Sequence, residues 1–198
     1  MLKDNADLSL NTRAAQFQAL LAACIFTDAT GQKLAIETGI QRAMQYLRTI
    51  RAQGNHVYLI GNGGSASIAS HTMTDFMNVA KLRAHTLHDS SIITCMTNDY
   101  GYENAFARML SQVVAKGDAL IAISSSGKSQ NIRNAATTVK QMGGIVITLS
   151  GFDRANPLRS LGDLNILLDS SDYGFIEIGH QFVLHNIADR FGQEGKAA

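Results

Sequence analysis

Short apolar runs alternate with longer stretches of helix-like length along the chain from residue 56 onward. The runs are apolar at consecutive positions, which is typical of strands that are buried on both faces under helices. We predict five strands of this kind, at 57–60, 91–95, 119–123, 145–149 and 164–168. Helices are expected around them, at 66–80, 102–115, 129–142 and 176–191, with a loose tail at 192–198.

This alternation predicts the fold class α/β, because strand–helix repeats form parallel sheets with right-handed crossovers. We expect a three-layer sandwich with a five-stranded parallel sheet in the flavodoxin-like order 2-1-3-4-5. In that order the first and third strands are neighbours, and ligands bind beyond their carboxyl ends.

The N-terminal part of the chain has a different pattern. Apolar residues recur at helical spacing through residues 11–54, with a break near Thr27, Asp28 and Gly31. We therefore predict two helices that form an N-terminal helical arm over residues 1–54, packed on the sheet or on a partner subunit. With 198 residues, the chain 1–198 is expected to be a single domain that includes this arm.

Composition narrows the class of protein further. Hydrophobic residues make up 45% of the chain, and the net charge of +1 gives no reason to expect a nucleic-acid partner. No apolar run is long enough to cross a membrane, and residues 1–5 lack the apolar core of a signal peptide. Cys24 and Cys95 lie in apolar runs and are expected to be buried free thiols, so we expect a cytoplasmic protein.

Two predicted strands lead directly into loops of small residues that open helices. The glycine loop is Gly-Asn-Gly-Gly-Ser-Ala-Ser at residues 61–67, and the serine loop is Ser-Ser-Ser-Gly-Lys-Ser at residues 124–129. Glycines let the backbone approach an anion, and the N–H groups and dipole of a helix N-terminus favour negative charge. Neither loop has the spacing of a dinucleotide-binding or Walker motif. Ordinary strand-to-helix turns are the alternative, but together the loops favour one phosphate site.

Two helices carry pairs of candidate acid, base or metal-binding residues. His71 and Asp75 lie four residues apart, and Glu177 and His185 lie eight apart, so each pair shares a helix face. Such a set suits a divalent transition metal such as zinc, although a histidine on a helix is more often a surface or structural group. His180 is a rival ligand, because it lies three residues after Glu177. Three further histidines have no partner pattern and are expected to be structural: His56, His85 and His88.

A polar segment that begins with Asn98 and Asp99 follows the second predicted strand. Asp99 is suited to cap a helix that begins near Tyr102. It is equally suited to reach substrate hydroxyls, since it leaves the same edge of the sheet. Both roles stay open at this point.

Four segments together resemble a known family. They are Gly61–Ser65, Asn98–Gly101, Ile123–Ser129 and Ile147–Gly151, in this order. Over about the whole chain they resemble the sugar isomerase (SIS) domain and, within it, the phosphoheptose isomerases. The resemblance implies a homotetramer with active sites between subunits, zinc as cofactor and a phosphorylated sugar as substrate. It implies conversion of sedoheptulose 7-phosphate to D-glycero-D-manno-heptose 7-phosphate, an early step toward bacterial surface heptose in lipopolysaccharide.

The resemblance also assigns roles to residues. The family's metal-binding histidine and glutamate fall on His71 and Asp75, and its glutamine and histidine fall on Glu177 and His185. Residues expected to contact the substrate are Asn62, Gly63, Gly64, Ser65, Asn98, Asp99, Ser124, Ser125, Ser126, Ser129 and Glu177.

This chain departs from the family at several of these positions. Asp75 is one methylene shorter than the family glutamate, which shortens its reach by roughly 1.5 Å. Glu177 replaces a neutral amide, so a bound divalent ion should be held more tightly. Further departures are Val79 in place of an arginine, with Lys81 or Arg83 as substitutes, and Gly174 and Phe175 in place of an acid–arginine pair.

The expected reaction is an aldose–ketose isomerisation through an enediol intermediate. It requires a base, an acid and stabilisation of charge on two oxygens, and we assign Asp75 as base and His185 as acid. A metal held by His71, Asp75, Glu177 and His185 would polarise the substrate. The alternatives are a non-catalytic SIS-domain adaptor or regulator that binds sugar phosphate, and an isomerase of another phosphosugar. An acid at position 75 together with His185 favours an enzyme.

Overall fold

Four of the five predicted strands form where apolar runs predicted them. In the computed structural model, which describes residues 8–194, these strands are buried along nearly their whole length. They are β3 (His56–Ile60), β5 (Ala119–Ile123), β6 (Ile145–Gly151) and β7 (Leu164–Leu168). Helices cover both faces of these strands, which explains why their sequences do not alternate.

The prediction of a strand at 91–95 is wrong, because this segment lies in helix α4 (Ser90–Tyr100). The side chain of Asp89 accepts hydrogen bonds from the backbone N–H groups of Ser91 and Ile92, at 3.0 and 3.1 Å. This N-cap starts a helix in spite of the β-branched residues that follow. The missing strand is β4 (Arg83–Thr86), an edge strand in which only Ala84 is fully buried.

The sheet has seven strands in the order β2-β1-β7-β6-β5-β3-β4 and is mixed. Strands β1 (Ile25–Asp28) and β2 (Lys33–Leu34) run antiparallel, and β1 also pairs antiparallel with β7. A five-stranded parallel sheet is therefore the wrong description of the whole. The remaining strands, β4-β3-β5-β6-β7, are parallel neighbours, and numbering them along the chain gives the order 2-1-3-4-5.

The hairpin β1–β2 separates the two N-terminal helices, α1 (Leu10–Ala22) and α2 (Ile36–Gln53). The break predicted near residue 28 is the turn of this hairpin, so residues 25–34 extend the sheet instead of continuing a helical arm. Asp28 stabilises the turn by accepting hydrogen bonds from the N–H groups of Thr30 and Gln32. Helix α2 packs on the sheet, whereas α1 buries no residue in the described structure and contacts α7 (Tyr173–Glu194) through Phe17.

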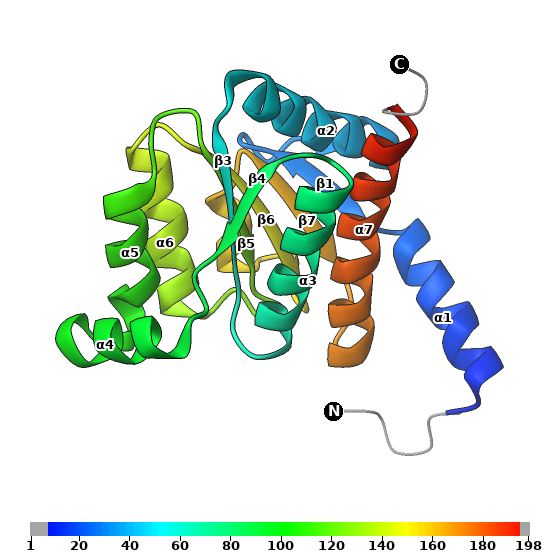
Figure 1. Cartoon of the computed structure of the whole chain (residues 1–198). Coiled ribbons are helices and arrows are strands. Elements are labelled where there is room, and N and C mark those ends of the chain that lie inside the picture. Colours follow the sequence, from blue (N-terminus) through cyan, green and yellow to red (C-terminus); the bar gives the residue numbers. More distant parts are fainter. Residues whose placement is uncertain (1–7, 195–198) are drawn as a thin grey trace.

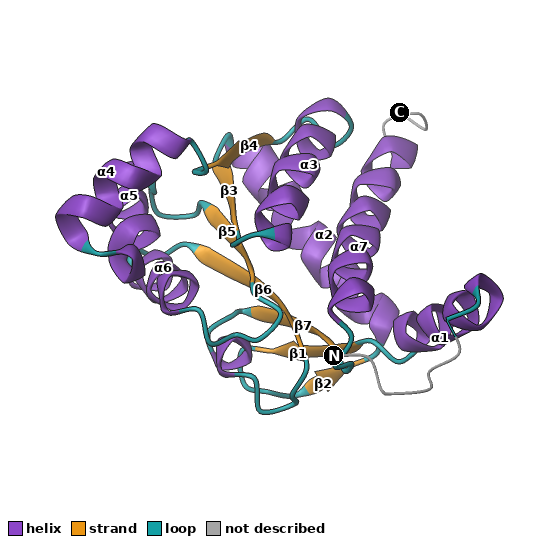
Figure 2. Ribbon diagram, turned by 90° about the horizontal axis from the view of Figure 1, so that it is seen from below, coloured by secondary structure: helices purple, strands orange, loops and turns teal. Residues whose placement is uncertain are grey.

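Helices form a layer on each side of the sheet (Figures 1 and 2). Helices α2, α3 and α7 lie on one side, and α3 and α7 run next to each other (Figure 1). Helices α4, α5 and α6 lie on the other side, and each layer has its own hydrophobic cluster. The remaining bounds are α3 (Gly64–Asn78), α5 (Ala105–Val113), α6 (Gln130–Gln141), α7 (Tyr173–Glu194), and the 3-10 helices η1 (Tyr102–Asn104) and η2 (Pro157–Ser160).

The ends of the chain limit two of the sequence predictions. Helix α7 continues to Glu194, so the predicted tail at 192–198 is helical over its first three residues, and residues 195–198 lie outside the described part. Residues 1–5, from which we predicted that no signal peptide is present, also lie outside the described part of the chain. Among residues 8–194, no helix is both long and apolar enough to cross a membrane.

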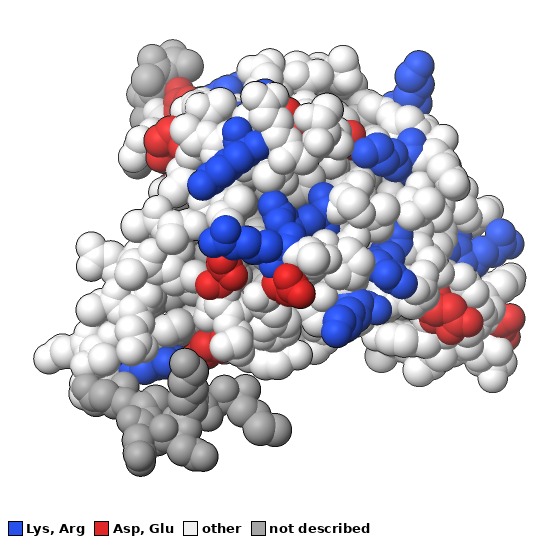
Figure 3. Space-filling view, turned by 180° about the vertical axis from the view of Figure 1, so that it is seen from behind, with Lys and Arg blue, Asp and Glu red and all other residues white. Residues whose placement is uncertain are grey.

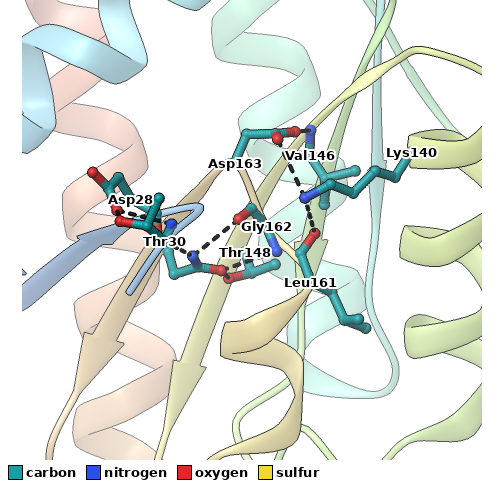
Figure 4. Close-up of polar contacts among 9 residues, drawn as sticks. Asp28, Thr30, Lys140, Val146, Thr148, Leu161, Gly162 and Asp163 are labelled. Carbon is teal, nitrogen blue, oxygen red and sulfur yellow. Dashed lines mark hydrogen bonds and ion pairs between the residues drawn. The ribbon is translucent and has the colours of Figure 1, made fainter. Parts of the chain in front are cut away.

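Polar contacts fix the connection from β6 to β7 at the end of the sheet opposite the two loops (Figure 4). Asp163 accepts a hydrogen bond from the N–H of Val146 at 2.8 Å and forms an ion pair with Lys140 at 3.3 Å. Lys140 also donates to the carbonyl of Leu161, and Thr148 donates to Asn165 within the sheet at 2.7 Å. Of these contacts only the one between Thr148 and Asn165 is buried, and together they connect η2, β6 and β7 to α6.

Candidate active site

The glycine loop and the serine loop meet at the carboxyl ends of β3 and β5, which are adjacent parallel strands. A cavity of about 160 Å³ lies between the loops and the start of α7. Its lining confirms that Ser65 lies beside the serine loop, as the strand order predicted. The lining residues are Asn62, Ser65, Ile123, Ser124, Ser125, Ser126, Ser129, Tyr173 and Glu177. We call this cavity the serine pocket.

Two helix N-termini supply donors to the serine pocket. Helix α3 begins at Gly64 and helix α6 begins at Gln130, and the N-cap residues Gly63 and Ser129 make no side-chain capping bond. In the first turn of α6, the side chain of Asn131 accepts a hydrogen bond from the N–H of Ile132. Uncapped N–H groups and the positive end of the helix dipole favour an anion. Together with the serine hydroxyls, they make the pocket suitable for a phosphate group.

Glu177 lies against the first residue of α3. A Cβ atom at Gly64 would lie only 2.4 Å from the Oε1 atom of Glu177, so a side chain at position 64 would displace the carboxylate. The carboxylate of Glu177 therefore occupies the rim of the serine pocket, where it adds negative charge. The sequence analysis assigned Glu177 both as a substrate contact and as a metal ligand; its place in the lining of the serine pocket agrees with the first role, and the cluster of potential metal ligands among the described residues is His71, Asp75 and His185.

Asn156 holds the serine loop in place, and sequence analysis missed it. Its amide Nδ2 donates hydrogen bonds to the carbonyls of Ser125 and Gly151, both at 3.0 Å. Gly127 has a φ of +63°, and a Cβ atom there would lie 1.7 Å from the Oδ1 of Asn156. The serine loop thus depends on glycine at position 127 and on the buried amide beside it. The available signal was the position of Asn156 in the loop that follows the fourth predicted strand.

Asn62 is oriented by two residues that the sequence analysis also missed. Its side chain exchanges two hydrogen bonds with Asn131, at 2.9 and 3.0 Å, and accepts a third from the hydroxyl of Tyr102 at 2.8 Å. Asn131 belongs to the first turn of α6, so these contacts connect the glycine loop to the serine loop.

His71, Asp75 and His185 form a second cluster further along α3 and α7. The Oδ2 atom of Asp75 lies 2.9 Å from Nδ1 of His185 and 3.4 Å from Nε2 of His71. One potential ligand atom from each of the three residues lies within 4.8 Å of the others. The hydrogen bond to Asp75 raises the pKa of His185, and Asp189, at 3.7 Å, contributes to the same shift. This arrangement combines a carboxylate with an imidazole that holds its proton more strongly than usual.

Three sequence candidates lie elsewhere. Asn98 and Asp99 are exposed on α4 and do not line the serine pocket, and Asn98 donates a hydrogen bond to Asp99. His180 is fully buried, and its Nε2 atom is bonded to the carbonyl of Ser150, so it does not join the cluster around Asp75.

The residues proposed to replace the missing family arginine are used in other contacts. Lys81 donates to the carbonyl of Asn78, and Arg83 donates to the carbonyl of Gly54, so neither is directed at Asp75. The adjacent acid–arginine pair of the family is absent before the last helix. Asp172 lies at that point instead and forms an ion pair with Arg13 of α1 at 2.5 Å.

The other histidine and cysteine predictions have mixed outcomes. His56 and His85 are hydrogen-bonded to each other at 2.8 Å, and His88 contacts the backbone of Gly61, as expected for structural residues. Both cysteines are free, but only Cys24 is buried. Cys95 is exposed on α4, because the predicted buried strand is a helix at the surface.

Comparisons with known proteins give consistent results. A family model of the SIS domain matches residues 29–151. A phosphoheptose isomerase of Pelobacter propionicus is 34% identical over 153 residues, which cover 74% of this chain and 80% of that protein. A phosphoheptose isomerase of Helicobacter pylori strain HPAG1 is 35% identical over 149 residues, which cover 72% and 77%. The solved structure of a phosphoheptose isomerase from Francisella tularensis matches with a TM-score of 0.78 at 25% identity, covering 93% of this chain and 98% of that one.

Proposed function

We propose that this chain, which belongs to the SIS domain family and within it to the phosphoheptose isomerases, converts sedoheptulose 7-phosphate into D-glycero-D-manno-heptose 7-phosphate. The reaction is an aldose–ketose isomerisation through an enediol intermediate, and it supplies a precursor of bacterial surface heptose. The observation that carries the proposal is a phosphate-type pocket at the first turns of α3 and α7, with a carboxylate–imidazole pair further along the same two helices.

The serine pocket anchors the phosphate group of the substrate. Ser65, Ser124 and Ser125 are buried there, and their hydroxyl groups and the helix amides can replace the water that a phosphate loses. Glu177 and His185 are separated by eight residues, which is ~12 Å along α7. A chain of several carbon atoms is therefore needed between the anchored phosphate and the acid–base pair, as in a heptose phosphate.

Asp75 and His185 move the proton between the two carbons of the substrate. Asp75 acts as the base that removes the proton next to the carbonyl, and His185, with its raised pKa, acts as the acid that protonates the oxygen. Their contact at 2.9 Å pairs the carboxylate of the base with the imidazolium of the acid, which favours the protonated form from which His185 donates. The phosphate anchor contributes by holding the reacting carbons near this pair.

The same cluster suits zinc, which we propose as the cofactor. Two imidazoles and one carboxylate, open to solvent, match the ligand type and number of catalytic zinc sites that keep one position free. Bound zinc would polarise the substrate carbonyl as a Lewis acid. His71, Asp75 and His185 would hold the ion, whereas Glu177 lies at the serine pocket.

We further propose a cytoplasmic homotetramer with active sites between subunits. His71 and His185 are both exposed in the single chain, and Ile178 and Phe182 present large apolar side chains to solvent on the same helix as His185. Such a surface next to an open site is suited to contact with another subunit. Two free cysteines are consistent with a reducing compartment.

The experiment is incubation of zinc-loaded protein with sedoheptulose 7-phosphate, followed by NMR detection of the aldoheptose phosphate. We expect product from the native chain, a rate at least about 100-fold lower for Asp75→Asn and His185→Gln, and little change for His56→Gln. Binding of the sugar phosphate without turnover would support the adaptor alternative. Turnover of a different phosphosugar, but not of this one, would show an isomerase of another substrate.

A further inference from the structure

A second cavity lies away from the serine pocket, beside the loop that joins β6 to β7. Its volume is about 320 Å³, and it lies between η2 and the hairpin β1–β2. Its lining includes Thr27, Gly31, Arg154, Asn156, Arg159 and Ser160. On the rear face of the molecule, lysine and arginine side chains gather near the middle, with acidic side chains next to them (Figure 3).

The two arginines of this cavity lie near the carboxylate of Asp169 and differ in how they contact it. Arg154 pairs with Asp169, with Nε and Oδ2 2.7 Å apart. Arg159 forms no ion pair with any described residue; its Nη1 donates to the carbonyl of Arg154, and its Nε is buried without a partner. Burial and the nearby charge of Arg154 lower the pKa of Arg159, and the carboxylate of Asp169 partly offsets this effect.

We propose that this cavity is a second anion site, which binds the phosphate group of a small metabolite. A guanidinium presents a planar set of donors that matches a phosphate, and here the Nε atom of Arg159 is buried and has no hydrogen-bond partner among the described residues. The hydroxyl of Thr27, which makes no side-chain hydrogen bond with the described residues, supplies a further donor on the cavity wall.

This site is connected to the serine pocket through Asn156. Asn156 lines the cavity and also donates its two amide hydrogen bonds to Ser125 and Gly151. At the start of the same loop, the ring of Phe152 contacts that of Tyr173, a residue of the serine pocket, with centroids 4.6 Å apart. An anion bound at Arg159 would therefore hold the loop, and through it the serine loop, so that each ligand strengthens binding of the other.

Calorimetric titration of the full chain with inorganic phosphate counts the sites. We expect two sites per native chain and one in Arg159→Gln, whereas Arg108→Gln, which changes an arginine on α5, keeps both. Ser126→Glu places a carboxylate in the serine pocket and should leave only the site at Arg159. In the double variant Ser126→Glu/Arg159→Gln, phosphate should bind this remaining site at least tenfold more weakly. One site in the native chain, or two in Arg159→Gln, would overturn the proposal.

A second probe tests the kind of ligand. Titration of the Ser126→Glu chain with glucose 6-phosphate should give binding at least as tight as with inorganic phosphate, because the cavity is larger than a phosphate ion. Binding of inorganic phosphate alone would overturn the assignment to a phosphorylated metabolite.

Discussion

Replacement of Asn156 by alanine tests how the serine loop is held. The substitution removes the hydrogen bonds to the carbonyls of Ser125 and Gly151 and the one that Oδ1 accepts from the N–H of Leu158, each 3.0 Å long. Both carbonyls keep one other partner, because Gly151 N–H donates to Ser125 and Asp153 N–H donates to Gly151. At ~1 kcal/mol for each lost bond, the free energy of unfolding should fall by about 3 kcal/mol.

The measurement is urea unfolding of the native chain, Asn156→Ala and Asn156→Asp, with Asn78→Ala as control. Asn78 is an exposed asparagine at the end of α3, so its replacement should change the free energy of unfolding by less than about 0.5 kcal/mol. Asn156→Asp keeps the side-chain volume but turns the donor into a carboxylate that faces two carbonyls, so it should be at least as destabilising as alanine.

The same variants should bind the sugar phosphate more weakly. Without Asn156 the serine loop must be ordered on binding, and we expect KM to rise about tenfold, which corresponds to ~1.4 kcal/mol. Steady-state kinetics at saturating zinc gives this value. A loss of stability below about 1 kcal/mol, or an unchanged KM, would refute the role assigned to Asn156.

Three further predictions follow from single residues. Glu177→Gln removes a like charge from the rim of the serine pocket and should lower KM about five- to tenfold, as checked by steady-state kinetics; a higher KM would contradict this placement of Glu177. Burial lowers the pKa of His180 to about 4, so the unfolded chain binds this proton first as the pH falls below about 6.5. The free energy of unfolding should therefore decrease between pH 7 and pH 5 by about 2 kcal/mol more in the native chain than in His180→Gln. Urea unfolding at both pH values measures this, and the same decrease in both chains would exclude the effect. Burial raises the pKa of Cys24 to about 12, so iodoacetamide should label exposed Cys95 in the native chain and leave Cys24 unmodified, as read by mass spectrometry.

The central strands were predictable because burial on both faces leaves an apolar run in the sequence. This holds for β5, whose five residues are all buried, but not for β4, an edge strand with alternating exposure. The segment after Asp89 shows the limit of this signal, since its apolar β-branched residues form a helix once Asp89 caps its start. Three-dimensional pairing with β7, which no local pattern reveals, places the segment Ile25–Asp28 in the sheet.

The parts of the site whose positions follow from the strand order were predictable from the sequence. The parts whose positions depend on how α3 packs against α7 were not. The glycine and serine loops meet because adjacent parallel strands end at the same edge. The spacing on α7 correctly predicted that Glu177 and His185 lie on the same side of the helix. It does not predict which residue of α3 each of them contacts. In the structure Glu177 meets Gly64 and His185 meets Asp75, so the two residues take part in different clusters.

A crystal structure of the chain with bound sedoheptulose 7-phosphate tests the central claim most directly. The account predicts the phosphate group in the serine pocket, within hydrogen-bond distance of the hydroxyl groups of Ser65 and Ser124, and the first two carbons beside Asp75 and His185. A sugar phosphate bound elsewhere, or one in the serine pocket whose carbonyl end points away from Asp75, would contradict it.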